Sequence, residues 1–167
     1  RRGEDLLREQ SCAFHSRFKQ TFPRIRNQSE VKVAKAALSN LLGGITYFYG
    51  PGLQWNANRT EIQETEPYEL FTDVPSRSTF PRGFLWDSGF HNLLIHRWDR
   101  RLSLEIIRNW AQRVDPLGWI AREQIPGEEA RSKVPPPYRA QDPRYANPPS
   151  MLLPILALAT QAENSDS

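Results

Sequence analysis

The sequence is poor in the residues that build cross-links and metal sites. Its 167 residues include one cysteine, Cys12, and three histidines. A single cysteine excludes a disulfide within the chain, and it also excludes metal and redox sites built from paired cysteines. We therefore expect Cys12 to be a small apolar residue on a helix.

Long apolar runs and a strong net charge are also missing. A membrane-spanning helix requires about 18 consecutive apolar residues, and no stretch of the sequence is that long. No signal peptide is visible. The formal net charge of +3 is too small to indicate a nucleic-acid partner. Arg97, Arg100 and Arg101 cluster, but Asp99 interrupts them, so we expect a solvated face there and no nucleic-acid partner.

What is present is the composition of a globular protein, with 38% apolar and 25% charged residues. The length fits one domain. The chain does not begin with Met and opens on a charged, helix-like segment, so we expect a fragment of a longer protein. The two sequons, at Asn27 and Asn58, are compatible with a glycoprotein of the secretory pathway.

Helical periodicity recurs along the chain and predicts a mainly α protein. Ser29 and Ser103 are predicted to cap two of the helices, and Gly43 with Gly44 to end one. Between the helices, residues 45–50 are β-rich and predict one short strand or extended strip. The expected helices cover residues 4–20, 29–42, 87–98, 103–114 and 151–159.

Two long segments lack clear periodicity. Residues 51–80 are expected to be an irregular connection, and residues 115–148, which are rich in Pro and Gly, a second ordered loop. Loops this long are uncommon in a compact domain unless they serve a function or are held by other parts of the protein.

The most informative stretch is residues 80–91, FPRGFLWDSGFH, in which one carboxylate, Asp87, lies among aromatic residues. Its position at a helix start is that of a cap or a first-turn charge. The neighbouring rings can instead desolvate the carboxyl and raise its pKa, as a general acid at neutral pH requires. The rings also offer flat faces for a sugar, and Arg82 offers donors for its hydroxyls. The three closest rings in the sequence are Phe84, Trp86 and Phe90.

The histidines do not have the spacing of a metal site. His91 lies four residues after Asp87, so on a helix the two share a face and can form a hydrogen bond. His96 follows five residues after His91, about 140° further around a helix. No HExxH pattern occurs. We expect no metal and no cofactor.

A second polar cluster lies in residues 118–135, GWIAREQIPGEEARSKVP. It combines a Trp, paired opposite charges and an amide, which is the composition of a polar ligand site and equally of a solvated loop. An exposed Trp on a loop is costly unless something covers it, which favours a site. The proline-rich stretch that follows is expected to be a stiff connector.

Taken together, these blocks resemble a known enzyme family. FPRGFLWDSGFH, HRWD, GWIAREQIPGEEARSKVP and ANPP, with LSNLLGGITYFYG before them, resemble the catalytic domain of the mannosyl-oligosaccharide glucosidases, or processing α-glucosidase I, of glycoside hydrolase family 63. The resemblance covers about residues 36 to 160. It implies an (α/α)6 toroid with long active-site loops, of which residues 1–167 would be a fragment of the single catalytic domain.

The resemblance also implies an activity. Such enzymes hydrolyse the terminal α-1,2-linked glucose of the triglucosylated N-glycan precursor, with inversion, which requires a general acid and a general base. Asp87 occupies the family's general-acid position. The family's base is a Glu from a later part of the domain, so this fragment alone is expected to be inactive. The implied partner is a glucosylated N-linked oligosaccharide in the endoplasmic reticulum lumen, with membrane association only through a segment outside this chain.

The chain departs from the family motif at two positions. Ser88 stands where Glu is expected, and Pro126 stands where Leu is expected. Neither change removes Asp87, and Ser88 is expected to lower the like-charge pressure on it. Glu123 and Glu128 are local candidates for a base, although we expect Glu123 to orient substrate or loop instead.

Two other functions stay open on the sequence. One is a different (α/α)6 glycosidase, such as a trehalase-like enzyme, and the other is a non-catalytic carbohydrate-binding fragment. Asp87 is the predicted catalytic residue. The predicted substrate-binding residues are Arg82, Phe84, Trp86, Phe90, His91, Trp119, Arg122, Glu123 and Gln124.

Overall fold

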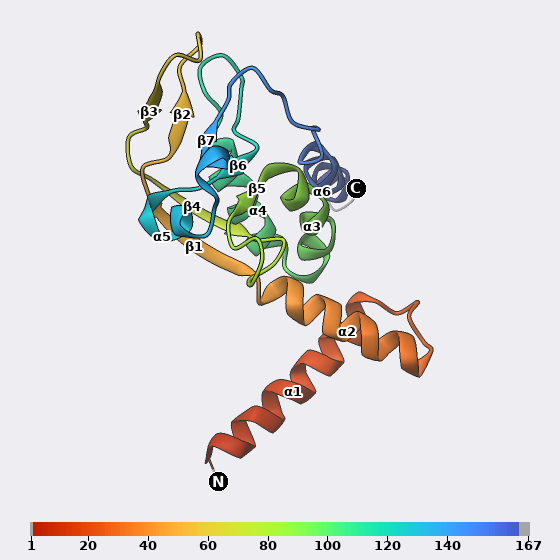
Figure 1. Cartoon of the computed structure of the whole chain (residues 1–167). Helices are drawn as coiled ribbons and strands as arrows, with labels where there is room; N and C mark the ends of the chain where they lie inside the picture. The colour runs from red at the N-terminus through yellow and green to blue at the C-terminus, as the bar shows by residue number, and fades with distance from the viewer. Residues whose placement is uncertain (1, 164–167) are drawn as a thin grey trace. The chain divides into compact units, whose positions relative to one another are not determined.

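A computed structural model of the chain describes residues 2–163, and the chain divides into two compact units, residues 1–40 and 41–167. Six α-helices dominate the described part, which confirms the mainly α class (Figure 1). The elements are α1 (Arg2–Thr21), α2 (Gln28–Leu42), β1 (Ile45–Gly50), β2 (Leu53–Trp55), β3 (Ile62–Glu64), β4 (Tyr68–Asp73), β5 (Gly83–Phe84), α3 (Leu85–Trp98), α4 (Arg100–Ala111), β6 (Glu123–Gln124), α5 (Gly127–Ser132), a 3-10 turn (Pro136–Tyr138), β7 (Ala140–Gln141) and α6 (Leu152–Glu163).

The first unit holds α1 and most of α2. Phe18 and Leu38 are its buried apolar residues, and the rings of Phe18 and Phe22 lie 5.2 Å apart. The predicted cap at Ser29 is wrong, because α2 begins at Gln28. Asn27 serves instead: its Oδ1 accepts from the Ser29 backbone N–H at 2.9 Å, as an N-cap side chain does.

The second unit contains more strand than the sequence predicts. The strand at residues 45–50 is confirmed as β1, which pairs antiparallel with β4. The expectation of an irregular connection over residues 51–80 is wrong, because β2, β3 and β4 all lie within it. The strand β4 finds its hydrogen-bond partners in β1, more than twenty residues away in some pairs, and local periodicity does not report such pairing.

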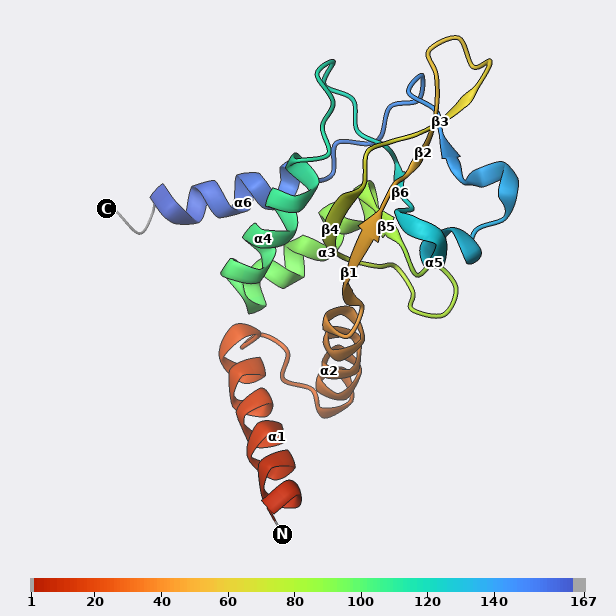
Figure 2. The ribbon, with the colours of Figure 1, turned by 90° about the vertical axis from the view of Figure 1, so that its left-hand side faces the viewer.

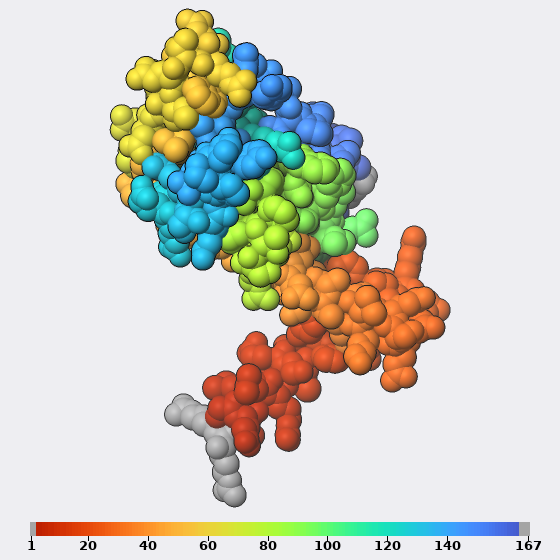
Figure 3. Space-filling view, viewed as in Figure 1, coloured from red at the N-terminus to blue at the C-terminus, as the bar shows by residue number. Residues whose placement is uncertain are grey.

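Two further small sheets pair strands that lie within the long connecting segments. One has the order β3-β2-β7, in which β2 runs antiparallel to β3 and parallel to β7, and the other is the β5–β6 ribbon. Figure 3 shows the yellow hairpin of β2 and β3 against the blue segment that contains β7. An ion pair of 3.6 Å between Arg59 and Asp142 joins the same two segments. The segment 115–148 is thus mostly loop, as predicted, but it is tied into sheets at both ends.

The helices of this unit follow the predictions with three corrections. The short helix α5 lies in a segment predicted to be loop, α4 runs from Arg100 to Ala111 and not over residues 103–114, and its cap is a different residue. Ser103 does not cap α4, because Asp99 holds that position and its side chain accepts from the Leu102 backbone N–H at 3.1 Å. Ser103 lies inside α4, fully buried, and its hydroxyl donates to Asn92 Oδ1 at 2.8 Å. A serine is an equally good cap by type, so the short turn between α3 and α4 decided which residue served.

The core of the second unit lies between α3, α4 and β4, and α6 packs against α3. Figure 2 shows these helices gathered beside the strands. Gly89 permits the contact of α6 with α3, since a Cβ on it would lie 2.6 Å from the Met151 backbone nitrogen. No helix within residues 2–163 has the length and apolar content to cross a membrane. The buried apolar core consists of Leu70, Leu85, Ile95, Ile106 and Trp110.

Candidate active site

The β5–β6 ribbon brings the two principal sequence motifs together. Gly83 pairs with Gln124 and Phe84 with Glu123. One residue further on, the Leu85 backbone N–H donates to the Arg122 carbonyl oxygen at 3.0 Å. The first turn of α3 therefore starts directly beside the Arg-Glu-Gln segment, although Leu85 and Arg122 are 37 positions apart in the sequence.

A buried ion pair locks this ribbon. Arg82 Nε donates to Glu123 Oε2 at 2.7 Å, and the two side chains are 8% and 16% exposed. The Arg82 guanidinium also lies over the ring of Phe84, at 4.7 Å from its centroid, while Phe84 itself is buried. Arg82 and Phe84, both predicted to bind substrate, thus have structural partners in each other and in Glu123.

Behind the ribbon, polar side chains line a cavity of about 260 Å³. Tyr68 donates its hydroxyl to Gln124 Oε1 at 2.6 Å, and burial raises the pKa of Tyr68 to about 12. The Glu123 backbone N–H donates to Gln141 Oε1 at 3.0 Å. Trp119 also lines the cavity, so three of the predicted binding residues, Trp119, Glu123 and Gln124, border one hollow.

Trp119 ties the proline-rich segment to the same region. Its indole N–H donates to the Tyr145 carbonyl oxygen at 2.8 Å, and Asn147 Nδ2 donates to the Ile120 carbonyl oxygen at 3.2 Å. Ser150 Oγ then donates to the Trp86 carbonyl oxygen at 2.6 Å. Residues 145–150, which include the ANPP block, therefore contact both of the other motifs.

Asp87 lies in the first turn of α3, partly buried. Burial raises the pKa of Asp87, against the opposing effects of His91, the backbone N–H and Arg122, and the charge of Asp73 adds to the rise. Trp86 and Phe90 flank it in the sequence and are 36% and 49% exposed. Their rings form an edge-to-face pair with centroids 6.2 Å apart. Asp87 thus lies between the two members of a surface aromatic pair in the sequence of the helix.

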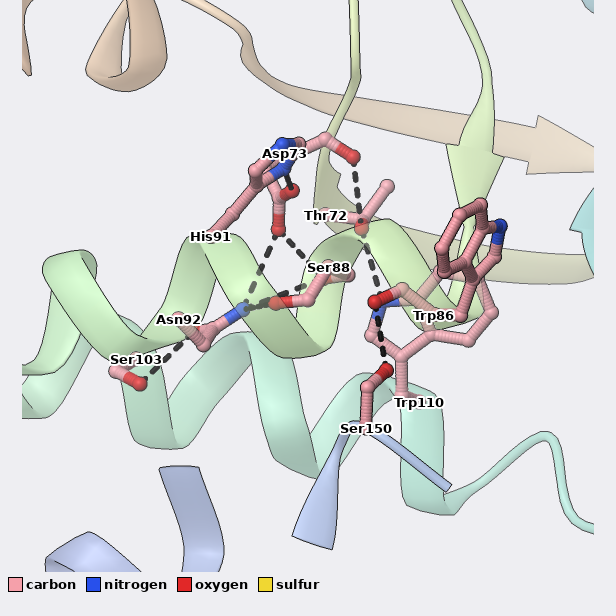
Figure 4. A network of polar contacts seen from close by, with 9 residues as sticks. All are labelled: Thr72, Asp73, Trp86, Ser88, His91, Asn92, Ser103, Trp110 and Ser150. Carbon is pink, nitrogen blue, oxygen red and sulfur yellow. Dashed lines mark hydrogen bonds and ion pairs between the residues drawn. The ribbon is translucent and has the colours of Figure 1, made fainter. Parts of the chain in front are cut away.

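Asp73, the last residue of β4, is a carboxylate that sequence reasoning missed. It is 1% exposed, and Ser88 Oγ donates to its Oδ1 at 2.6 Å (Figure 4). Asn92 Nδ2 donates to the same oxygen at 3.3 Å, and His91 Nδ1 pairs with Oδ2. The signal in the sequence was the run YELFTD, which is rich in residues that favour strands and ends in a carboxylate before Val-Pro.

The network around Asp73 changes two of the sequence interpretations. The Nδ1 atom of His91 bonds Asp73 and not Asp87, the partner that helical spacing suggested. Burial lowers the pKa of His91, but the hydrogen bond and charge of Asp73, with the charge of Asp87, outweigh it and leave that pKa raised. Ser88 does not face Asp87, because its hydroxyl is fully buried on Asp73.

The two local candidates for a base have different surroundings. Glu123 is held by Arg82 in the ribbon. Glu128, in α5, has a side chain that is 94% exposed and pairs with Arg131 at 3.4 Å. Arg122, predicted to bind substrate, is exposed beside the ribbon and lowers the pKa of Asp87 by its charge.

The profile of the glycosyl hydrolase family 63 C-terminal domain matches residues 2–167. The chain is 46% identical over 160 residues to alpha-glucosidase 2 of Arabidopsis thaliana, which covers 90% of this chain and 20% of that protein. It is 44% identical over 159 residues to mannosyl-oligosaccharide glucosidase GCS1 of the same plant, covering 90% of this chain and 19% of that protein.

A yeast relative shows a similar degree of identity. The mannosyl-oligosaccharide glucosidase of Saccharomyces cerevisiae is 48% identical over 143 residues, which are 78% of this chain and 17% of that protein. The chain thus spans about a fifth of the length of these curated relatives. With a family profile that runs over residues 2–167 and relatives of this similarity, the chain belongs to glycosyl hydrolase family 63.

Proposed function

We propose that this chain is part of the catalytic domain of an inverting exo-α-glucosidase, with Asp87 as its general acid. The substrate is the terminal α-1,2-linked glucose of the triglucosylated N-glycan precursor. The observation that carries the proposal is the carboxyl of Asp87, whose pKa burial raises and which lies next to the surface ring of Trp86. Relatives that carry the name mannosyl-oligosaccharide glucosidase support the choice of substrate.

In this mechanism the carboxyl of Asp87 is protonated when the substrate binds. It donates its proton to the glycosidic oxygen as the bond from that oxygen to the anomeric carbon breaks. A water activated by a general base attacks the opposite face of the sugar, which inverts the configuration. The base comes from a part of the domain outside this chain. Trp86 and Phe90 supply flat apolar faces on which a glucose ring can stack.

The Arg82–Glu123 pair serves this site by position. It fixes the β5–β6 ribbon, and through the hydrogen bond from Leu85 to Arg122 it fixes the first turn of α3, where Asp87 lies. Removing one partner of a buried ion pair leaves an uncompensated charge, typically at a cost of about 3–5 kcal/mol. Glu123 is therefore a residue that orients the site and not its base.

We also propose that residues 1–167 are a fragment of one (α/α)6 toroid. The helix α6 supports this, because it exposes a row of large apolar side chains that a further helix of the domain would cover. The location follows from the substrate: the endoplasmic reticulum lumen, with any membrane anchor in a segment outside this chain. Both sequon asparagines, Asn27 and Asn58, are exposed. The exposed row on α6 is Leu152, Leu153, Ile155 and Leu156.

Asp87→Asn in the whole enzyme tests the proposal. General acid catalysis contributes about 10²–10⁴-fold, so glucose release from a triglucosylated glycan should fall by that factor. The matched control is Asp142→Asn, the same change at a carboxylate paired with Arg144 on the connector, where turnover should stay close to that of the parent.

The same assay separates the alternatives. The parent should release glucose from the glycan and not from trehalose, and the first glucose to appear should be the β-anomer. Full turnover in Asp87→Asn would refute the acid assignment, and preference for trehalose would favour the trehalase-like enzyme. Binding of the glycan without turnover in the parent would favour a non-catalytic carbohydrate-binding role.

A further inference from the structure

Two carboxylates, from different elements, flank one imidazole. His91 lies one turn after Asp87 on α3, and its Nδ1 pairs with Asp73 at the end of β4. The Asp73 side chain is 1% exposed and that of His91 is 25% exposed. Asp73 is thus buried too deeply for a substrate, while His91 lies between it and the first turn of α3.

Asp73 is held so that one oxygen is left for the imidazole. Oδ1 accepts from Ser88 at 2.6 Å and from Asn92 at 3.3 Å, and Asn92 is oriented by Ser103. Oδ2 faces His91, as Figure 4 shows. The hydrogen bond and the charge of Asp73 raise the pKa of His91, which favours a positive charge on its ring.

We propose that Asp73 and His91 are a positioning pair, in which Asp73 keeps a positive charge on His91 beside Asp87 and that charge limits how tightly Asp87 holds its proton. This inference rests on the proposed role of Asp87 as general acid. The pair would act through Asp87 and need not touch the substrate itself.

The charges that face Asp87 come from three elements. His91 on α3 and Arg122 before β6 lower its pKa, and Asp73 at the end of β4 raises it by a smaller effect than either. Losing the cation on His91 therefore removes a larger contribution than losing the anion on Asp73. His91→Asn should therefore raise the pKa of Asp87, because it removes the larger of the two contributions.

This arrangement offsets the effect of burial on the pKa of Asp87. Burial alone pushes the pKa of Asp87 upward, and an acid that holds its proton too tightly transfers it poorly, since efficiency is greatest when the pKa lies near the working pH. The cation on His91 offsets part of that rise. The pair thus tunes the acid without occupying the space where the sugar binds.

The test is a pair of NMR titrations on the whole enzyme. The first follows the Asp87 side-chain carbon in the parent, in His91→Asn and in Ser88→Ala. Asn places its amide nitrogen close to the position of Nδ1, so it keeps a donor for Asp73 and removes only the charge. Ser88→Ala is the matched control, because it deletes a bond to Asp73 without touching His91.

We expect the Asp87 titration to move to higher pH in His91→Asn and to stay in place in Ser88→Ala. The second titration follows the His91 ring in Asp73→Asn, where loss of the carboxylate should move it to lower pH, because burial then acts unopposed by its main partner. Should Asp73→Asn fail to fold, His91→Asn still decides the matter. An unmoved Asp87 titration in His91→Asn would overturn the proposal.

The pH dependence of catalysis supplies a separate measurement. The alkaline limb of kcat/KM reports the general acid, so in His91→Asn it should shift to higher pH, which a purely structural role of His91 would not produce. Turnover retained in Asp87→Asn would refute the proposed function alone, because the NMR titrations do not depend on catalysis. A fixed alkaline limb together with an inactive Asp87→Asn would refute the positioning pair alone.

Discussion

The two sides of α3 differ in a way that reverses the usual pattern of a surface helix. One side is buried, and beside the core residues Leu85 and Ile95 it holds two polar ones: Ser88 and Asn92 are fully inaccessible and bonded to Asp73. The opposite side is apolar and exposed, with Trp86, Phe90 and Leu94 repeating every four residues. Helices of globular proteins normally place these residue types the other way round.

The reversal shows what each side is for. Buried polar groups are tolerated when they are hydrogen-bonded, and here they hold a charge close to Asp87. Exposed rings lose their contact with water when a ligand or another segment covers them. Asp87 and His91 lie at the border between the two sides, where a buried charge network and a stacking surface meet.

The largest expected effect comes from making the buried side apolar. In Asn92→Leu, Asp73 and Ser103 lose a hydrogen-bond partner each, and a buried polar group left unsatisfied costs about 1–3 kcal/mol. The free energy of unfolding of the chain, measured in urea, should fall by the sum of the two costs. Leu94→Asn is the reverse exchange, made on the exposed side, and should change the free energy of unfolding by no more than about 0.5 kcal/mol. Equal effects would mean that the two sides do not differ.

A smaller effect is expected where α3 meets α6. Gly89→Ala places a Cβ 2.6 Å from the Met151 backbone nitrogen, and overpacking of this kind costs about 1–3 kcal/mol. Gly3→Ala in α1 is the control, because no atom lies within 4 Å of the new Cβ. It should stabilise the helix by about 0.5–1 kcal/mol. Thermal unfolding measures both, and a gain in Gly89→Ala would show that α6 does not pack this closely.

The smallest effect on folding is expected on the exposed side. Trp86→Ala removes an edge-to-face pair with Phe90, which is worth about 0.5–1.5 kcal/mol. In the whole enzyme the same change should raise KM for the glycan, and Trp86→Phe should restore most of the binding. If KM stays constant while stability falls by more than in Gly89→Ala, the rings belong to the core of the complete domain and not to a sugar site.

The sequence predicted some parts of this structure well because their causes are local. The helices over residues 87–98 and 151–159 were found from their periodicity, and α3 and α6 confirm them. The strand β4 was missed because its partner β1 lies on the other side of a hairpin and a long turn. Asp73 was missed with it, although it is the centre of the polar network.

Side-chain partners show the same division. The sequence placed Asp87 and His91 on one helical face, which is correct, but it paired them with each other. The structure gives His91 Nδ1 to Asp73, because β4 delivers a buried carboxylate to that side of α3. Helical spacing predicts only neighbours on the same helix, whereas His91 bonds a carboxylate from another element.

By itself, the sequence determined the mainly α class, the family and an aromatic setting for Asp87, since residue order and motif spacing carry all three. Only the tertiary structure decided that Arg82 pairs with Glu123, that Ser88 faces Asp73 and that His91 lies between two carboxylates. Each of these contacts joins segments far apart in the chain. Their geometry comes from strand pairing and helix packing, which no local pattern of residues encodes.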